Sequence, residues 1–144
     1  MVHWAESYKM GKKEEEVILP ILKQYFGRDI KQYPERYSKY DYYDDKYQYE
    51  VKTRTNALKA YDTTMITEDK VRDCKCPVML LFNFTDCIAS IEFNEEKFKP
   101  YERKPFSRAK IKEDEKEHIY IPITDLNIIH KKKIEIPHYI FSDA

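Results

Sequence analysis

The sequence predicts an α/β protein with a central mixed β-sheet and helices on its faces. Three features indicate this class: a helical apolar pattern near the start, several runs of strand-like alternation, and two consecutive apolar runs in the middle of the chain. The chain has 144 residues, 42% of them hydrophobic, and a mean hydropathy of −0.80. This length and composition predict one domain over residues 1–144, with a core that needs no disulfides.

The first predicted element is a helix over residues 12–26. Its apolar side chains recur at helical spacing on one stripe: Val17, Ile18, Ile21, Leu22 and Tyr25. Gly27 is placed to end the helix, because glycine readily adopts the left-handed conformation found there. Pro20 lies inside the pattern and is expected to kink the helix, because proline lacks a backbone donor.

Aromatic and polar residues then alternate, which predicts two strands, 39–43 and 47–54, around the polar turn Asp44-Asp45-Lys46. In the first of these strands the alternation points Tyr40 and Tyr42 to the same face, and Asp41 to the other. Residues 56–75 are predicted to be helical toward their end, with Thr67 as the N-cap.

The most apolar runs, 77–84 and 87–93, predict a hairpin at the centre of the sheet. Residues 95–117 are crowded with charge and predict an exposed excursion. Two late strands are expected at 119–123 and 134–141, with a helical turn from Asp125 to His130 between them.

Composition excludes several classes of protein. Lysine plus arginine and aspartate plus glutamate balance at 26 each, which excludes nucleic-acid binding by bulk charge alone but leaves a local basic patch open. Two glycines are too few for glycine-rich phosphate loops. No apolar run approaches a membrane span, the start lacks a signal peptide's apolar stretch, and three cysteines form no disulfide framework. We therefore expect an intracellular protein that makes no membrane contact.

Carboxylates and a lysine gather on the two strands around the polar turn. Alternation places Glu50, Lys52 and Arg54 on one face of the second strand, with Tyr49 and Val51 on the other. If Tyr43 faces Gln48, then Asp41 lies opposite Glu50, and two facing carboxylates repel each other. A divalent cation such as Mg²⁺ or Mn²⁺ would offset that repulsion. An exposed hairpin with a merely solvated polar face is the alternative interpretation.

This arrangement resembles the PD-(D/E)XK nuclease superfamily, which has the restriction-endonuclease-like fold. The resemblance rests on Asp41 and the Glu50-Val51-Lys52 tripeptide, on adjoining predicted strands after an acidic helix. It covers about residues 11–93, and residues 94–144 match no pattern of that family. It implies that Asp41, Glu50 and the carbonyl of Val51 hold Mg²⁺ or Mn²⁺. It also implies that Lys52 orients or activates the attacking water, or stabilises the pentavalent state at the phosphorus.

The resemblance also implies a glutamate from the first helix. The family's G-x-x-x-E opening selects Glu15, which would hold a metal-bound water or a second metal ion, although a helical wheel leaves Glu14 open. A polar residue after the motif often faces the site in this family, which points to Lys70 and, less directly, to Thr67; Arg54 is a candidate contact for the phosphate backbone. The chain departs from the family by having Tyr40 where the motif's proline would stand.

The function implied is a metal-dependent deoxyribonuclease that cuts by in-line attack of a metal-bound water, leaving a 5′-phosphate and a 3′-hydroxyl. DNA is favoured over RNA, and endonuclease over exonuclease. The chain leaves little room for a recognition domain, so sequence specificity would need a homodimer or a partner. Its size suits a repair, recombination, or phage or viral nuclease. The alternatives are an inert module of the same fold that binds nucleic acid or protein, and an unrelated α/β interaction module.

Overall fold

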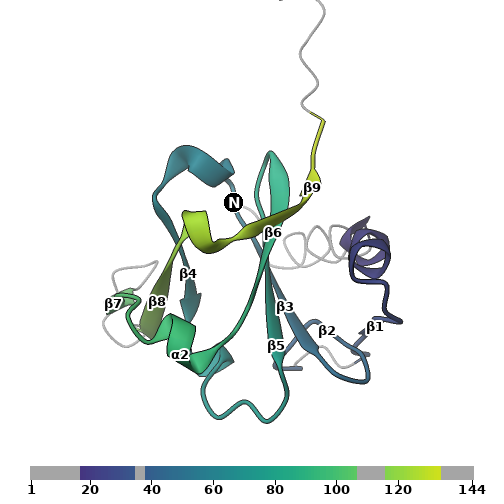
Figure 1. Ribbon diagram of the computed structural model, residues 1–144, viewed down its shortest axis with the longest axis horizontal. Coiled ribbons are helices and arrows are strands. Elements are labelled where there is room, and N and C mark those ends of the chain that lie inside the picture. Colours follow the sequence, from purple (N-terminus) through teal and green to yellow (C-terminus); the bar gives the residue numbers. More distant parts are fainter. Residues whose placement is uncertain (1–16, 35–37, 107–115, 134–144) are drawn as a thin grey trace, which may run out of the picture.

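The computed structural model describes residues 17–34, 38–106 and 116–133. Within them the strands form a six-stranded mixed sheet, in the order β1-β2-β3-β5-β6-β9, and a three-stranded antiparallel sheet, in the order β4-β8-β7 (Figure 1). The predicted α/β class with a mixed sheet is confirmed.

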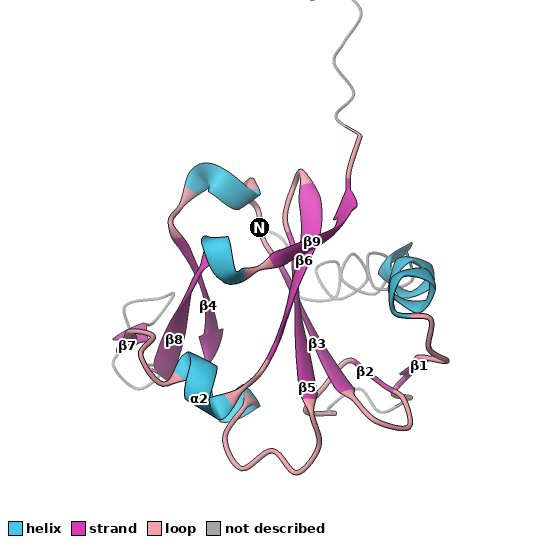
Figure 2. Ribbon diagram, viewed as in Figure 1, coloured by secondary structure: helices cyan, strands magenta, loops and turns pink. Residues whose placement is uncertain are grey.

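The elements of the larger sheet are β1 (Lys31–Gln32), β2 (Tyr42–Tyr43), β3 (Gln48–Thr53), β5 (Val78–Asn83), β6 (Cys87–Glu92) and β9 (Asn127–Lys131). Those of the smaller sheet are β4 (Thr63–Thr67), β7 (Arg103–Phe106) and β8 (Lys116–Pro122). The described helices are residues 17–26, α2 (Glu95–Phe98) and the 3-10 helices η1 (Leu58–Ala60), η2 (Glu68–Lys70) and η4 (Ile123–Asp125). Figure 2 distinguishes these helices from the strands by colour.

The centre of the larger sheet has the predicted hairpin. Strands β5 and β6 pair antiparallel, with Leu80 opposite Ile91, and β5 pairs parallel with β3 on its other side. All six residues of β5 are buried, because both faces of this strand are covered.

The larger sheet is covered differently on its two faces. One face packs against the helix of residues 17–26, where Ile18 and Leu22 meet Tyr49 and Leu81. The other face packs against the smaller sheet, in a cluster formed by Leu58, Ile66, Val71, Val78, Leu80, Phe82, Phe84, Cys87, Ala89, Ile91, Phe98, Ile119 and Ile121. The polar side chains of β3 therefore lie on the face that the smaller sheet covers.

The first helix differs from its prediction in its buried side. Ile18 and Leu22 are buried as expected, but Val17 and Tyr25 are 67% and 52% exposed, because the helix turns only a narrow stripe toward the sheet. Gly27 has a φ of +62° and its amide donates to the Lys23 carbonyl at 3.0 Å, which confirms it as the end of the helix. Pro20 lies within the helix without ending it.

The helix predicted toward the end of residues 56–75 is wrong. Residues 63–67 form β4, with Thr64 and Ile66 buried, and only the three residues of η2 follow as a helical turn. This segment is rich in threonine and its buried residues alternate, so pairing with β8 outweighs the helical signal at Thr67.

Two later predictions also need correction. The helical turn expected at residues 125–130 is a strand, β9, which follows η4 and adds to the edge of β6. The charged excursion at 95–117 contains α2, whose Phe98 is fully buried, and β7. The strand expected at 119–123 is confirmed as part of β8, and that at 134–141 lies outside the described residues. No described helix is long and apolar enough to cross a membrane.

Candidate functional site

The carboxylate of Glu50 lies at the centre of the candidate site. Glu50 is in β3 beside Leu80 of β5, and only 4% of the residue is exposed. Its neighbours Tyr49 and Val51 pack on the helix side of the sheet, so the predicted alternation along this strand is confirmed. The carboxylate on the polar face of this strand is therefore buried between two sheets, whereas Gln48 and Lys52 on the same face are partly exposed.

Two lysines neutralise this buried carboxylate. Lys52 Nζ lies 3.6 Å from Glu50 Oε1, and Lys70 Nζ lies 3.2 Å from Glu50 Oε2. The Lys70 contact is an ion pair rather than a well-aligned hydrogen bond, because Oε2 has no described partner of hydrogen-bonding geometry. Lys70 Nζ is held in place by donating to the Lys39 carbonyl at 2.6 Å. The predicted residue Lys70 therefore reaches the site, although it comes from η2 and not from a full helix.

The acidity of Glu50 is strongly perturbed. Burial raises the pKa of its carboxyl, the nearby charge of Asp41 raises it further, and Lys52 and Lys70 lower it. The net result is a pKa of about 7. A group that titrates near neutrality in a cluster of charges is typical of functional sites.

Asp41 lies just before β2, where the strand pairing stops. The register of β2 and β3 is the predicted one, with Tyr43 opposite Gln48. The Asp41 amide donates to the Tyr49 carbonyl at 3.0 Å, and its carboxylate Oδ2 accepts the Val51 amide at 2.8 Å. The side chain thus replaces a missing strand partner at the edge of β3.

The alternation predicted for residues 39–43 breaks at this point. Tyr42 packs on the helix side of the sheet, whereas Tyr40 packs against the cluster shared by the two sheets. We predicted that these two tyrosines point the same way, and that prediction is wrong. Only residues 42–43 are strand, so residues 40 and 41 are not bound to the strand's period of two.

Whether these residues suit a divalent cation depends on their donors. The amide and carbonyl of one strand residue face the same edge, so the Val51 carbonyl faces the edge at which Asp41 lies. Two carboxylates and a carbonyl are oxygen donors of the kind that Mg²⁺ and Mn²⁺ take. No cluster of three or more histidine, cysteine or acidic side chains lies within the described ranges, and Glu14 and Glu15 fall outside them.

The other predicted substrate contacts have different surroundings. The Arg54 guanidinium donates to the Met65 carbonyl of β4 and lies 5.7 Å from the Phe82 ring centroid, so it bridges the two sheets. Thr67 precedes η2, and its hydrogen bond is the main cause that lowers the pKa of Asp69. Both residues are therefore better explained by these local contacts than by contact with a substrate.

Sequence reasoning missed one residue of the site, Tyr40. Its hydroxyl donates to the Lys70 carbonyl at 2.6 Å, and burial raises its pKa to about 12, so it remains a donor at neutral pH. Its position beside Asp41 was the available signal, but the assumed alternation assigned it to the opposite face.

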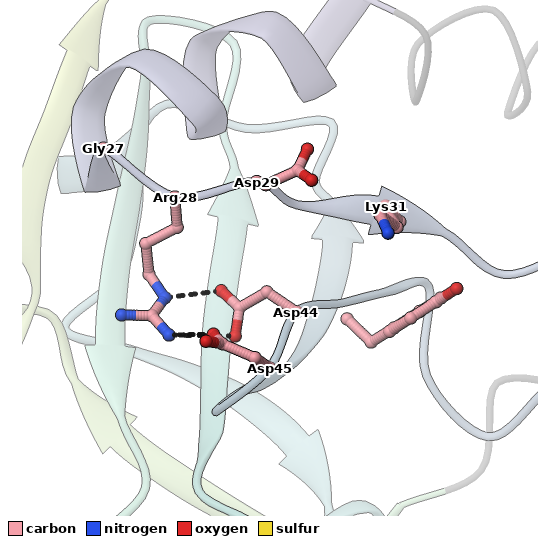
Figure 3. A pocket seen from close by; sticks show the side chains of 7 residues that line it. Gly27, Arg28, Asp29, Lys31, Asp44 and Asp45 are labelled. Carbon is pink, nitrogen blue, oxygen red and sulfur yellow. Dashed lines mark hydrogen bonds and ion pairs between the residues drawn. The ribbon is translucent and has the colours of Figure 1, made fainter.

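The turn between β2 and β3 holds a second cluster of charge. Asp44 accepts Arg28 Nε at 2.6 Å, and Asp45 accepts another Arg28 nitrogen at 2.5 Å, beside a pocket of about 510 Å³ (Figure 3). The Asp44 carboxylate also accepts hydrogen bonds from the Tyr49 hydroxyl and from the backbone amides of Lys46 and Tyr47. These bonds fix the turn and thereby the start of β3.

Comparison with known proteins gives no match to a family model, a curated protein or a solved structure. The candidate site therefore stands on its own geometry.

Proposed function

We propose that this chain is a metal-dependent nuclease, with Asp41, Glu50, Lys52 and Lys70 at its site. The observation that supports the proposal best is the burial of Glu50 between two lysines with Asp41 nearby. Glu50 lies in β3, and Asp41 directly precedes β2, the strand that pairs with β3. Lys52 lies two residues beyond Glu50 on the same face of β3. Hydrolysis of a phosphodiester needs an activated water and positive charge near the phosphorus. A metal held by the two carboxylates would supply the first, and the lysines supply positive charge.

Each residue has a role in this proposal. Asp41, Glu50 and the Val51 carbonyl would hold Mg²⁺ or Mn²⁺, which would activate water and polarise the phosphate. Lys52 is 35% exposed at its side chain, so its ammonium can turn from Glu50 toward an entering phosphate and stabilise the developing charge. Lys70 would keep the buried carboxylate ionised. The assignment of Glu15, with Glu14 as its alternative, remains a part of the proposal.

The substrate and compartment are proposed more coarsely. We expect DNA rather than RNA and internal rather than terminal cutting, with sequence specificity only through a second copy or a partner. The three cysteines are free, which suits a reducing intracellular compartment.

An inert binding module is the second candidate. It is favoured by the observation that both Glu50 oxygens already face lysines and that Asp41 already accepts the Val51 amide. The lysines supply the offsetting charge that we had assigned to a cation. In such a module the same four residues would be structural, and the cluster would need no metal.

Cleavage assays distinguish the two. We expect the full chain to cut supercoiled plasmid, linear duplex or single-stranded DNA in Mg²⁺ or Mn²⁺ and not in EDTA, with RNA as a further substrate to compare. Lys52→Ala should reduce the rate by about a hundredfold or more, because a charge that stabilises the transition state is lost. Lys97→Ala, which removes an exposed lysine of α2, is the matched control and should leave the rate unchanged.

The inert alternative gives the opposite pattern. No cutting of any substrate in either metal, together with no rise in Tm on adding Mg²⁺ or Mn²⁺, would reject the nuclease, because a ligand that binds the folded state must stabilise it. Equal cutting by the wild type and Lys52→Ala would instead point to a contaminating nuclease.

A further inference from the structure

A pocket lined by tyrosines lies beside the Glu50 cluster. Its volume is about 390 Å³, and among the residues that line it are Tyr33, Tyr40, Lys39, Gln48 and Lys75. We call this the tyrosine pocket. Both tyrosine rings are partly exposed, and both lysines are exposed.

Three residues of the tyrosine pocket, Tyr40, Lys39 and Gln48, connect it to the Glu50 cluster. Tyr40 donates from its hydroxyl to the Lys70 carbonyl, and Lys70 donates from Nζ to the Lys39 carbonyl. Gln48 lies two residues before Glu50 on the same face of β3, a separation of about 7 Å along the strand. A nucleotide next to a phosphate at Glu50 would therefore reach the pocket.

The rings are held in place before any ligand arrives. The Tyr33 hydroxyl donates to Gln48 Oε1 at 2.5 Å, and its ring centroid lies 4.4 Å from that of Tyr43. Tyr40 is fixed by its bond to Lys70. Rings that are already ordered bind a planar partner at a lower entropic cost than mobile ones.

The chemistry of the lining selects a base rather than a phosphate. Asp73 also lines the pocket and disfavours an anion inside it. Lys39 Nζ lies 5.6 Å from the centroid of the Tyr40 ring, and a base that stacks on this ring would displace it outward. The flexible ammonium groups of Lys39 and Lys75 would then reach phosphates outside the pocket. Stacking on a tyrosine requires an unpaired base with a free face, which a duplex does not offer.

We propose that the tyrosine pocket binds an unpaired base of single-stranded nucleic acid, next to the phosphate that the Glu50 cluster engages. The proposal rests on the proposed function for its location beside the cleaved bond. It names the substrate class, a single strand or a single-stranded region of DNA, in place of an intact duplex.

The test measures binding in EDTA, where no cutting occurs. Binding is followed by fluorescence anisotropy with a labelled oligothymidylate and with a labelled duplex of equal length. At the same salt concentration, the full chain should bind the oligothymidylate more tightly than the duplex. Tyr33→Leu should weaken binding of the single strand by about tenfold, because stacking of one base is worth about that factor. Tyr33→Phe keeps the ring and should restore most of the affinity. Tyr25→Leu changes an exposed tyrosine on the opposite side of the sheet and should have no effect.

The two proposals fail in different ways. Unchanged affinity in Tyr33→Leu, with its folding verified by circular dichroism, would overturn the tyrosine pocket, as would an equal loss in Tyr33→Phe or tighter binding of the duplex. Tyr33-dependent binding of the single strand without any metal-dependent cutting would uphold the pocket and reject the nuclease. If the wild type and Tyr33→Leu cut duplex DNA at the same metal-dependent rate, the nuclease proposal would be upheld and the proposed role of the tyrosine pocket rejected.

Discussion

Asp41 illustrates how one carboxylate can serve both the fold and the chemistry. Its Oδ2 accepts the Val51 amide at the edge of β3, and its charge raises the pKa of Glu50. The first effect stabilises the folded chain, whereas the second opposes it. Substitutions that remove one effect without the other can separate them.

Two substitutions of Asp41 should therefore differ in stability. Asp41→Asn keeps an acceptor for the Val51 amide and removes the charge near Glu50, so the free energy of unfolding in EDTA should stay equal to that of the wild type or rise. Asp41→Ala leaves that amide without its acceptor and should lower the free energy by about 1–2 kcal/mol. Urea unfolding measures both. Under the proposed function, both variants should lose metal-dependent cutting.

An equal loss of stability in Asp41→Asn and Asp41→Ala would contradict this account, because the hydrogen bond to the Val51 amide would then not be the stabilising contact. Lys97→Ala again serves as the control, since it changes an exposed side chain outside the cluster.

At the scale of elements, the turn between β2 and β3 positions the site. Asp44 is almost fully buried at its side chain, at 2% exposure, and pairs with Arg28 at the end of the first helix. Burial alone would raise the pKa of Asp44, but the hydrogen bonds from Arg28 and Tyr49 and from the Tyr47 and Lys46 amides outweigh it and hold the pKa well below its usual range. The turn is thus stabilised by an ionised carboxylate.

This predicts a pH-dependent role for Asp44. A group whose pKa is lowered on folding contributes stability above its unfolded pKa and loses that contribution as the pH falls. Asp44→Asn should lower the free energy of unfolding at neutral pH by about 2 kcal/mol, because the ion pair with Arg28 is lost. The difference from the wild type should shrink below about pH 4. Urea unfolding across the acid range measures it; a difference that is constant with pH would contradict the role of the charge.

The elements that sequence patterns predict best are those whose neighbours lie close in the chain. The β5–β6 hairpin is an example, since Leu80 and Ile91 meet across a short turn. The pattern at 63–67 was misread because its strand pairs with β8, more than fifty residues away, and only that pairing makes Ile66 a buried strand residue. A local signal such as the Thr67 cap cannot compete with such a contact.

At the scale of the whole molecule, the packing of the two sheets sets the acidity of Glu50. The smaller sheet covers the polar face of β3, and η2, which follows β4, brings Lys70 to Glu50. The pKa of about 7 is therefore a property of the folded chain, since the ordinary value is 4.5. Unfolding returns the carboxyl to that value.

The stability of the whole chain should consequently depend on pH near neutrality. A carboxyl whose pKa is raised on folding contributes stability that is complete below its unfolded pKa and is lost as the pH rises through its folded pKa. In EDTA, the Glu50 contribution should fall by roughly 3 kcal/mol between about pH 4.5 and 7.5, since one pKa unit corresponds to about 1.4 kcal/mol. The free energy of unfolding of Glu50→Gln should lack this fall with pH, because glutamine does not titrate. Urea unfolding at several pH values measures the difference between the two chains.

Adding Mg²⁺ extends this test. A bound cation favours the ionised carboxylate of Glu50. Saturating Mg²⁺ should therefore abolish most of the fall in the wild type's free energy of unfolding with pH. It should leave the pH profile of Glu50→Gln unchanged. A wild-type profile parallel to that of Glu50→Gln in EDTA would show that Glu50 is not perturbed by the fold.

By itself, the sequence determined the α/β class, the central hairpin, the end of the first helix at Gly27 and the division of β3 into an apolar and a polar face. These follow from periodicity and from the conformational preferences of single residues, which act over a few positions. Only the tertiary structure decided that Glu50 on the polar face is buried, that Lys70 meets Glu50 and that Tyr40 turns away from Tyr42 to line a pocket. Those features depend on contacts between residues that are distant in the chain. A local sequence pattern cannot predict such contacts, because it carries no information about which distant residues pack together.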